Sequence, residues 1–380
     1  MKPGFIFFAT VLVFLTGCGT FGGREEQNPP AKLEPFAETI KLNRIWKTTS
    51  GKILNSNRQI QPVLVDTILY TASSDGKINA FDAETGNRIW SRKLKLNLSA
   101  GIGYGDGLIF VGSEEGEVIA LYASNGEPAW VGDAKGGVLA SPAGGMNIAV
   151  VPTSGNKIVG LSSTDGSAVW TLSETTPRLL LRGRGRPLVV TDVVLAGFDN
   201  GKLMLIRLDN GQRLWEVRVG EAIGKTEIER LADVDARPVL INDTVYAAAY
   251  QSRIVAIDAP TAKMIWENKI STNKDMDAND KHLYVVAEGD IVYAINRNTG
   301  ETVWEQDKLE NRNLTPPAVI GSFIMVGDSM GYIHLLNAET GEISGRVKTG
   351  SELLSQPVTR GSSAWVQTLD GDVIAWQLAE

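Results

Sequence analysis

Few residues of this 380-residue chain have the types and spacing that catalysis or metal binding requires. Asp233 and Asp235 stand two apart in an Asp-Val-Asp sequence, and paired carboxylates can perform general acid–base catalysis. No nucleophile or metal partner lies near them in the sequence, so a polar helix end is the plainer interpretation. His282 and His334 are the only histidines, and they are too far apart to give metal-ligand spacing. The sequence therefore predicts no catalytic residue, no metal site and no cofactor.

Cys18 is the only cysteine, and its position favours lipid attachment over disulfide chemistry. A positive charge and an apolar run at residues 5–15 precede it, which is the layout of a secretory signal and too short for a membrane span. The Leu-Thr-Gly directly before Cys18 resembles a bacterial lipobox, which implies removal of residues 1–17 and lipidation of Cys18. Gly19 resembles the sorting pattern of outer-membrane lipoproteins, so we expect a lipid anchor on the periplasmic face of the outer membrane. A plain signal peptide with an incidental cysteine is the alternative.

Residues 18–38 are rich in glycine, proline and charged side chains, and this composition buries too little surface to fold alone. We therefore expect a flexible lipidated tether there, with a reach of roughly 25 Å. Residues 39–380 form the folded body. The formal net charge of the chain is −7, and an acidic body argues against nucleic acid as a partner. Membrane contact is expected only through the lipid anchor.

The folded body is organised by a repeat in which a tight turn is followed by a tryptophan. The copies end at Trp90, Trp130, Trp170, Trp215, Trp266 and Trp304, with Gly345 in the seventh place. The steps are 40, 40, 45, 51, 38 and 41 residues, a period that indicates one unit repeated about an axis. Residues 62–92 contain four short apolar runs between turn signals, which is typical of a four-stranded antiparallel β-propeller blade. The tryptophans are expected to wedge between adjacent blades; a cofactor site is the sharper alternative.

The number of tryptophan positions predicts an all-β, eight-bladed propeller whose ring is closed by the N-terminal strand. Trp46 precedes Trp90 by 44 residues and has no blade in front of it. At the other end, residues 363–378 provide inner strands of a last blade, and then the chain ends. We expect residues 42–48 to supply the missing outer strand, because this pairing removes an exposed sheet edge.

The repeat resembles a known one. The pattern A-x-D-x-x-T-G-x-x-x-W, clearest at Ala80–Trp90 and Ala294–Trp304, resembles the tryptophan-docking repeat of pyrroloquinoline quinone dehydrogenases. Those enzymes commonly have a calcium site and a vicinal disulfide beneath the cofactor. A single cysteine cannot form that disulfide, so the resemblance implies the fold and not the cofactor. WD40 repeats fit less well, because the sequence has no Trp-Asp or Gly-His dipeptide.

The whole chain resembles the BamB family, the propeller lipoproteins of the machinery that assembles β-barrels in the outer membrane. The lipobox, the tether, the eight blades and two insertions carry this resemblance. It implies a non-enzymatic scaffold that binds the periplasmic POTRA domains of BamA, alongside other barrel-assembly subunits. Unfolded outer-membrane proteins are a further partner that the resemblance raises, as are delivery and insertion of barrel precursors.

The first insertion is residues 177–187, PRLLLRGRGRP, which combines leucines with four arginines. Leu179, Leu181 and Arg182 match the family's interaction loop, so the resemblance implies that they bind the partner. Apolar anchors beside arginine also suit an interface hot spot. A solvated loop whose leucines join the core is the plainer alternative.

The second insertion is residues 225–238, KTEIERLADVDARP. Thr226 and Glu229 form a capping-box pattern that predicts a short helix. Asp233 and Asp235 match the family's acidic pair in the same interaction surface, and we expect both insertions to emerge near each other on one rim.

Two other functions stay open on the sequence alone. A small quinone-dependent dehydrogenase without the disulfide would show cofactor absorbance and dye reduction after addition of the quinone and calcium. A generic periplasmic peptide-binding propeller would pair extended substrates with its exposed strand edges. The latter overlaps with barrel assembly, because unfolded barrel strands are such substrates.

Overall fold

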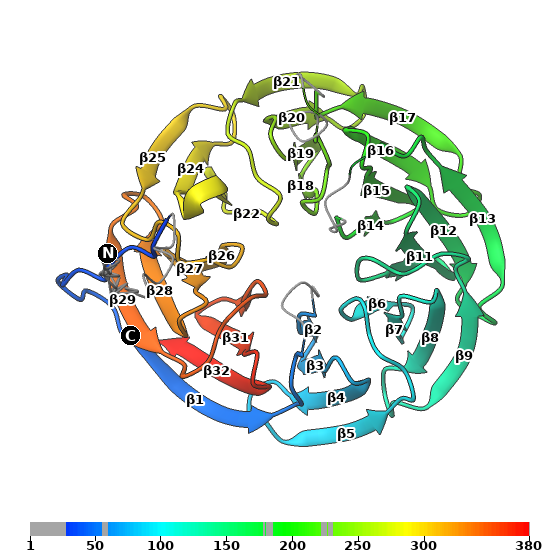
Figure 1. Ribbon diagram of the computed structural model, residues 1–380, viewed down its shortest axis with the longest axis horizontal. Helices are drawn as coiled ribbons and strands as arrows, with labels where there is room; N and C mark the ends of the chain where they lie inside the picture. Colours follow the sequence, from blue (N-terminus) through cyan, green and yellow to red (C-terminus); the bar gives the residue numbers. More distant parts are fainter. Residues whose placement is uncertain are drawn as a thin grey trace, which may run out of the picture.

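The computed structural model describes residues 28–54, 60–177, 179, 185–221, 226 and 231–379. Its strands form eight four-stranded antiparallel sheets, which stand as blades around a common axis (Figure 1). The predicted all-β, eight-bladed propeller is confirmed. The predicted signal peptide, Cys18 and the first part of the predicted tether lie outside the described residues, as does most of the predicted helix at residues 226–229.

Seven blades run in chain order from an innermost strand near the axis to an outermost strand at the perimeter, and the last blade takes its outermost strand from the N-terminal part of the chain (Figure 1). The innermost strands are β2 (Val63–Val65), β6 (Gly103–Gly105), β10 (Ala143–Gly145), β14 (Leu188–Val190), β18 (Val239–Ile241), β22 (Asp277–Ala278), β26 (Ala318–Ile320) and β30 (Val358–Arg360). The second strands are β3 (Ile68–Ala72), β7 (Leu108–Gly112), β11 (Ile148–Thr153), β15 (Val193–Gly197), β19 (Thr244–Ala248), β23 (His282–Val286), β27 (Phe323–Gly327) and β31 (Ser363–Gln367).

The third strands are β4 (Lys77–Asp82), β8 (Glu117–Tyr122), β12 (Lys157–Ser162), β16 (Lys202–Arg207), β20 (Ile254–Asp258), β24 (Val292–Asn296), β28 (Tyr332–Asn337) and β32 (Asp372–Leu378). The outermost strands are β5 (Arg88–Lys93), β9 (Pro128–Asp133), β13 (Ala168–Ser173), β17 (Arg213–Arg218), β21 (Lys263–Asn268), β25 (Thr302–Gln306), β29 (Ile343–Lys348) and β1 (Leu42–Thr49). A 3-10 turn, η1 (Glu288–Asp290), joins β23 to β24. Blades are numbered 1 to 8, from β2–β5 to β30–β32 with β1.

The N-terminal strand closes the ring as the sequence predicted. β1 pairs antiparallel with β32 from Leu42 opposite Leu378 to Thr49 opposite Asp372, so the two ends of the chain share blade 8. This pairing covers the edge that β32 would otherwise expose to other chains.

Tryptophans join seven of the eight blades to the next, which confirms the packing role expected from the repeat. The indole Nε1 donates to a backbone carbonyl of the following blade, and Trp130 to Ser163 at 2.7 Å is one case. The same bond is made by Trp46, Trp90, Trp170, Trp215, Trp266 and Trp304 at 2.8–3.0 Å. The ring covers a turn glycine: a Cβ on Gly166 would lie 2.5 Å from the Trp130 ring. That glycine also has φ +76°, so both space and backbone favour it.

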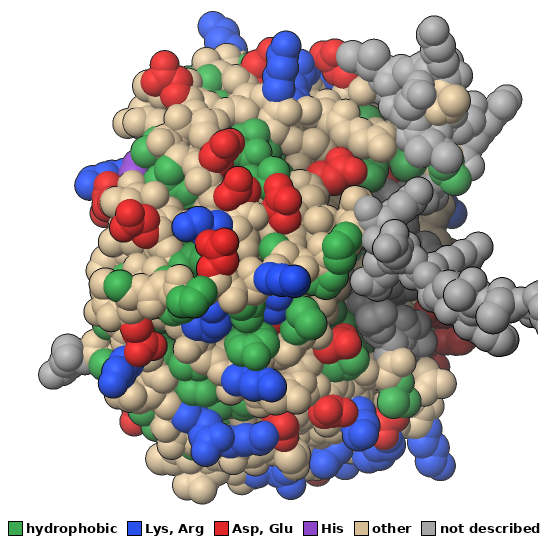
Figure 2. Space-filling view, turned by 60° about the vertical axis from the view of Figure 1, so that its left-hand side comes forward, with side chains coloured by type: hydrophobic (Ala, Val, Ile, Leu, Met, Phe, Trp, Pro, Cys, Tyr) green, Lys and Arg blue, Asp and Glu red, His purple; other side chains and the backbone are tan. Residues whose placement is uncertain are grey.

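A β-bulge beside each of these tryptophans turns its side chain toward the following blade. Between β8 and β9, Trp130 opposes Ala120 and Pro128 opposes Leu121, so Ala129 has no partner of its own. Such an extra residue bends the strand and re-aims the side chains beside it. In other blades the bulge residue is an exposed aliphatic side chain, such as Ile89, Val169 or Leu214. Figure 2 shows one side of the ring, where apolar, acidic and basic side chains are interspersed.

Residues 28–41, which include part of the predicted flexible tether, lie along the edge of blade 7. The amides of Thr39 and Ile40 both donate to the carbonyl of Ser344, the bulge residue of β29. This contact explains Gly345 in the tryptophan position: a Cβ there would lie 2.7 Å from the Ile40 oxygen. In most of the other blades, a turn between the third and outermost strands carries the glycine on which the preceding blade's tryptophan ring packs. Blade 8 has no such turn, because its third and outermost strands, β32 and β1, are the two ends of the chain. The described part of the stretch that we expected to be flexible thus contacts the propeller from Ala31 onward.

Two arginines hold this N-terminal segment and also enclose His334. Arg312 donates to the carbonyl of Ala31 at 2.8 Å, and the Arg346 guanidinium lies 4.8 Å from the centre of the Phe36 ring. Arg346 Nε donates to His334 Nδ1 at 3.1 Å, so His334 must place its proton on Nε2, which faces Asp328 at 3.0 Å. His334 is therefore a fully buried, neutral core residue.

Candidate functional site

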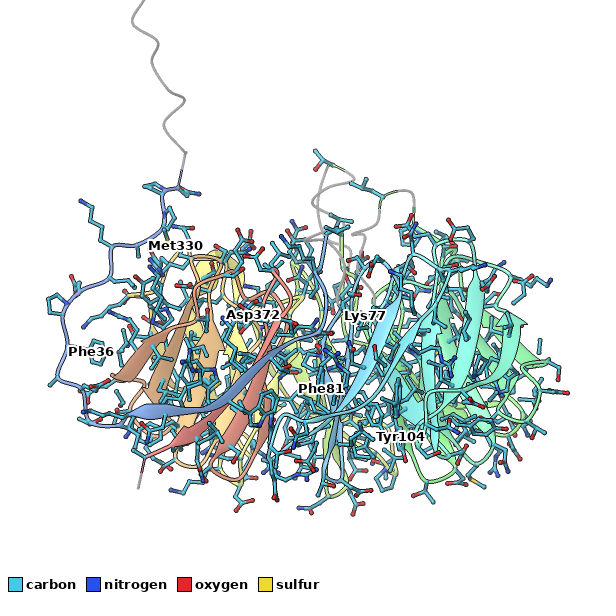
Figure 3. All side chains as sticks on the ribbon, turned by 90° about the horizontal axis from the view of Figure 1, so that it is seen from below. Phe36, Lys77, Phe81, Tyr104, Met330 and Asp372 are labelled. Atoms are coloured by element: carbon cyan, nitrogen blue, oxygen red, sulfur yellow. The ribbon has the colours of Figure 1, made fainter. Side chains whose placement is uncertain are left out.

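The loops that connect one blade to the next lie on a single face of the ring, which we call the insertion rim. One such loop shows the geometry: Ser329, in the turn before β28, donates its amide to Arg312 in the loop between β25 and β26 at 3.1 Å. Met330 lies beside them at the upper edge of Figure 3, whereas Tyr104 lies toward the opposite edge. Both insertions are loops of this kind, one between β13 and β14 and the other between β17 and β18.

The described ends of the two insertions touch each other, as the sequence predicted. A Cβ on Gly185, in the first insertion, would lie 3.0 Å from the Asp235 carbonyl in the second. The end of the second insertion is held firmly: the Asp233 carbonyl accepts from the Tyr250 amide at 2.9 Å, and Val234 is 1% exposed. A Cβ on Gly197 would lie 2.2 Å from the Val234 oxygen, so only glycine permits this close approach.

The predicted partner-binding residues differ in their surroundings. Leu179 is 40% exposed in the first insertion, so its side chain is accessible on this rim. Leu181 and Arg182 lie outside the described residues. Asp233 and Asp235 are 1% and 4% exposed, so their carboxylates face protein rather than solvent. Their role as partner contacts stays a prediction; in this structure they would act by holding the second insertion in place.

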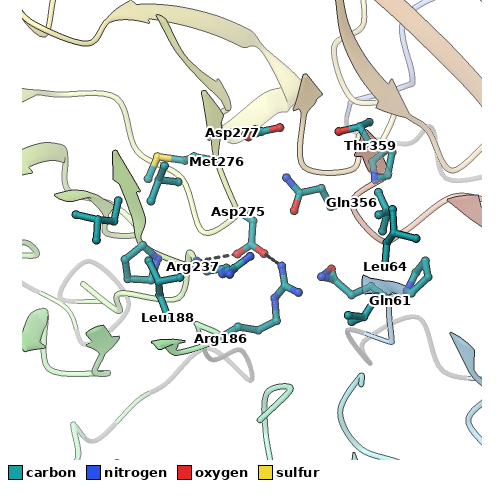
Figure 4. Close-up of a pocket in the computed structure, with 17 residues that line it drawn as sticks. Gln61, Leu64, Arg186, Leu188, Arg237, Asp275, Met276, Asp277, Gln356 and Thr359 are labelled. Atoms are coloured by element: carbon teal, nitrogen blue, oxygen red, sulfur yellow. Dashed lines mark hydrogen bonds and ion pairs between the residues drawn. The ribbon is translucent and has the colours of Figure 1, made fainter. Parts of the chain in front are cut away.

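An arginine near the end of each insertion lines the same cavity among the innermost strands, and both arginines contact Asp275. Each insertion ends in Arg-Pro, and the two arginines are Arg186 and Arg237. Arg186 Nη2 lies 2.8 Å from Asp275 Oδ2, and the Arg237 backbone amide donates to Asp275 Oδ1 at 2.7 Å (Figure 4). Asp275, in the loop before β22, thereby ties the two insertions to each other and to blade 6.

These residues line a cavity of about 450 Å³ among the innermost strands of the ring (Figure 4). Its walls are the starts of innermost strands from five blades, and Gln61 and Gln356 face the arginines across it. Burial within the ring, reinforced by the charge of Arg186, lowers the pKa of Arg237 to about 10. Burial also raises the pKa of Asp277 above its ordinary value, although the amides of Val319 and Ala278 donate to it.

Sequence reasoning counted Arg186 among the arginines of the first insertion and missed Arg237, Asp275 and Gln356 as a group. They lie far apart in the chain and converge only because the blades form a ring. A usable signal was the repeated Xaa-Pro before innermost strands, at residues 61–62, 186–187, 237–238 and 356–357. No group of three or more His, Cys, Asp or Glu able to hold a metal ion occurs among the described residues. No helix in that part of the chain is long and apolar enough to cross a membrane.

Comparison with known proteins identifies the family. The family model described as outer membrane protein assembly factor BamB matches residues 74–306 and 287–379. The chain belongs to the BamB family. An outer membrane protein assembly factor BamB from Alkalilimnicola ehrlichii is 42% identical over 381 residues, covering 100% of this chain and 98% of that protein. The crystal structure of BamB from Moraxella catarrhalis has a TM-score of 0.82 at 28% identity, covering 89% of this chain and all of that one.

The enzymes whose repeat this BamB-family chain shares are similar in fold alone. A quinohemoprotein alcohol dehydrogenase from Comamonas testosteroni has a TM-score of 0.70 at 13% identity, covering 88% of this chain and 76% of that chain. At that identity the common architecture carries no activity with it. The features that set the BamB-family chain apart from a plain ring of blades are the two insertions and the cavity where they end.

Proposed function

We propose that this protein is an outer membrane protein assembly factor that acts as a non-enzymatic, lipid-anchored scaffold on the periplasmic face of the outer membrane. One observation carries the proposal: the two segments that interrupt the blade repeat meet on one rim, and the first presents a half-exposed leucine there. Membership of the BamB family and the names of its relatives support the assembly role.

The partner that we propose is the set of POTRA domains of BamA, within the assembly complex. Leu179 and Leu181 would enter an apolar pocket of the partner, and Arg182 would fix its orientation by charge. Asp233 and Asp235 would act as positioning residues, since the segment that contains them packs against the first insertion and the body of the ring. Apolar anchors with a charged neighbour commonly dominate the energy of an interface.

The N-terminal segment supports a defined orientation at the membrane. The Ala31 amide donates to the Glu310 carbonyl at 2.9 Å, in the loop that leads into blade 7 on the insertion rim. Followed back toward its N-terminus, the described chain therefore lies at this rim at Ala31, and the link to a lipidated Cys18 would continue from there. We propose that the anchor and the partner-binding rim share one face, so that membrane attachment also orients the scaffold toward the complex.

The test is recovery of the assembly complex from membranes with the full, lipidated chain. We expect Leu179→Glu to abolish co-purification of BamA, because a charge would replace an anchor at the interface. Leu214→Glu is the matched control, since Leu214 is a leucine of 42% exposure on outermost strand β17, away from the insertion rim. Undiminished recovery of BamA with folded Leu179→Glu would overturn the proposed docking surface.

A further inference from the structure

The cavity contains one guanidinium group, that of Arg237, which makes no hydrogen bond or ion pair among the described residues, although Asp275 and Asp277 are near enough to attract its charge. Arg186 and Asp275 satisfy each other at 2.8 Å, with both side chains at most 15% exposed. The Gln61 amide lies against Arg186 as well, with its oxygen accepting from the guanidinium. The second Asp275 oxygen accepts from the Arg237 backbone, not from its side chain. Asp275 is therefore already occupied by Arg186 and by a main-chain donor.

Arg237, by contrast, is not paired through its side chain. Its side chain is exposed within the cavity, and among the described residues its guanidinium has no hydrogen bond or ion pair. Residues of five blades line the cavity around it, and their burial of the group disfavours its charged form. Its lowered pKa reflects burial and the nearby charge of Arg186, which together outweigh the attraction of Asp275 and Asp277. A guanidinium offers a fork of donors that matches a planar carboxylate, and a bound anion would relieve the setting.

The remaining walls indicate what accompanies the anion. Leu64, Leu188, Met276 and Val358 provide apolar surface of the cavity, and Gln356 provides an amide. Figure 4 shows Leu64 across the cavity from Arg237. The volume of about 450 Å³ is in the usual range for sites that bind small molecules. Two arginines and two aspartates line the cavity, so its charge is nearly balanced. A monoanion suits such a site better than a dianion, which Asp275 and Asp277 would repel.

We propose that this cavity binds a carboxylate that adjoins an apolar group, with Arg237 as its anion-binding residue. Two sources have this chemistry: a small carboxylic acid, and the C-terminal carboxylate of an extended peptide that ends in an apolar residue. The site lies among the innermost strands of the ring and does not include Leu179. Occupancy therefore does not depend on the proposed partner docking.

The experiment measures binding by calorimetry with the full chain in detergent. The probes are acetate, an acetylated tetrapeptide that ends in leucine with a free carboxylate, the same peptide as its C-terminal amide, and inorganic phosphate. We expect the free-acid peptide to bind and the amide to bind at least tenfold more weakly, because a charge-assisted hydrogen bond is lost. Competition by acetate alone at similar concentration would assign the site to small acids rather than to peptide ends.

Substitutions show where the probe binds. Arg237→Gln is expected to weaken the free-acid peptide at least tenfold, and Arg237→Lys to weaken it less, because the charge remains but the fork of donors is lost. Arg44→Gln, at an exposed arginine of β1, is the matched control and should leave binding unchanged. The thermal midpoint of each variant verifies that it is folded.

The proposal would be overturned by a wild-type chain that binds neither the peptide nor acetate, by equal binding of acid and amide, or by tighter binding of phosphate. Co-purification separates this proposal from the docking surface. Arg237→Gln should retain BamA, whereas Leu179→Glu should retain the carboxylate site.

Discussion

Removal of one inter-blade tryptophan tests the packing account quantitatively, and Trp130→Ala is the sharpest case. Trp130 is 7% exposed, and its ring centre lies 5.9 Å from that of Phe110. Its indole also donates to the Ser163 carbonyl at 2.7 Å and covers Gly166. Truncation would therefore open a cavity between blades 2 and 3 and would leave a buried carbonyl without its donor.

The size of the effect follows from the buried area. A buried tryptophan removes ~200 Å² from water, and at ~25 cal/mol per Å² this is about 5 kcal/mol, of which alanine retains a small part. We expect a loss of ~4 kcal/mol in unfolding free energy, in agreement with the usual cost of about 3–5 kcal/mol for large aromatic residues. With an unfolding entropy of ~2.1 cal/mol/K per residue over roughly 340 residues, the thermal midpoint should fall by about 6 °C.

The assay is thermal unfolding followed by far-UV circular dichroism at one protein concentration and one scan rate. Val131→Ala is the control, because Val131 is the next residue of β9 and is 60% exposed, so its loss should change stability by at most about 0.5 kcal/mol. Trp130→Phe should fall between the two, since an aromatic ring remains but the indole N–H is lost. A midpoint for Trp130→Ala within 1 °C of the Val131→Ala value would refute the reasoning.

The N-terminal segment and its arginine cluster give two further expectations. Burial lowers the pKa of His334 below its ordinary 6.5; Asp328 opposes this shift and Arg346 reinforces it. As the pH falls, the unfolded chain therefore binds a proton at this histidine before the folded chain does. The unfolding free energy should therefore decline as the pH falls below about 6.5, and His334→Gln should show a smaller decline between pH 7.5 and 5.5; an equal decline would contradict this. Gly345→Leu should displace the backbone at Ile40 and accelerate limited proteolysis within residues 28–41, whereas unchanged cleavage would show that the contact does not hold the segment.

The repeat determined most of the architecture in advance, for a physical reason. Each copy contains the tryptophan and the turn that join neighbouring blades, so counting copies amounts to counting inter-blade contacts. Trp46 and the missing outer strand were enough to predict the closure between β1 and β32. Gly345 was recognised as an empty position, but the sequence did not reveal what replaces the ring there.

The rest depended on contacts between residues far apart in the chain. Residues 28–38 have the composition of a tether, and their attachment rests on backbone bonds of Ala31 and on one aromatic ring beneath Arg346. The cavity depends on Arg186 and Asp275, which are 89 residues apart and meet only because successive blades curve around the axis. Local patterns do not encode such convergence, whereas the Arg-Pro that ends each insertion was visible and can now be interpreted.

The most direct test of the central claim, that the insertion rim is the face that binds the assembly machinery, is site-specific photo-crosslinking in membranes. A crosslinking residue would be placed at Leu179 on the insertion rim, at Leu214 on the perimeter, and at Met146, which is 56% exposed in the turn between β10 and β11 on the opposite face. We expect a crosslink to BamA from position 179 and none from positions 214 and 146. Crosslinks from position 146 or 214, with none from 179, would contradict the account.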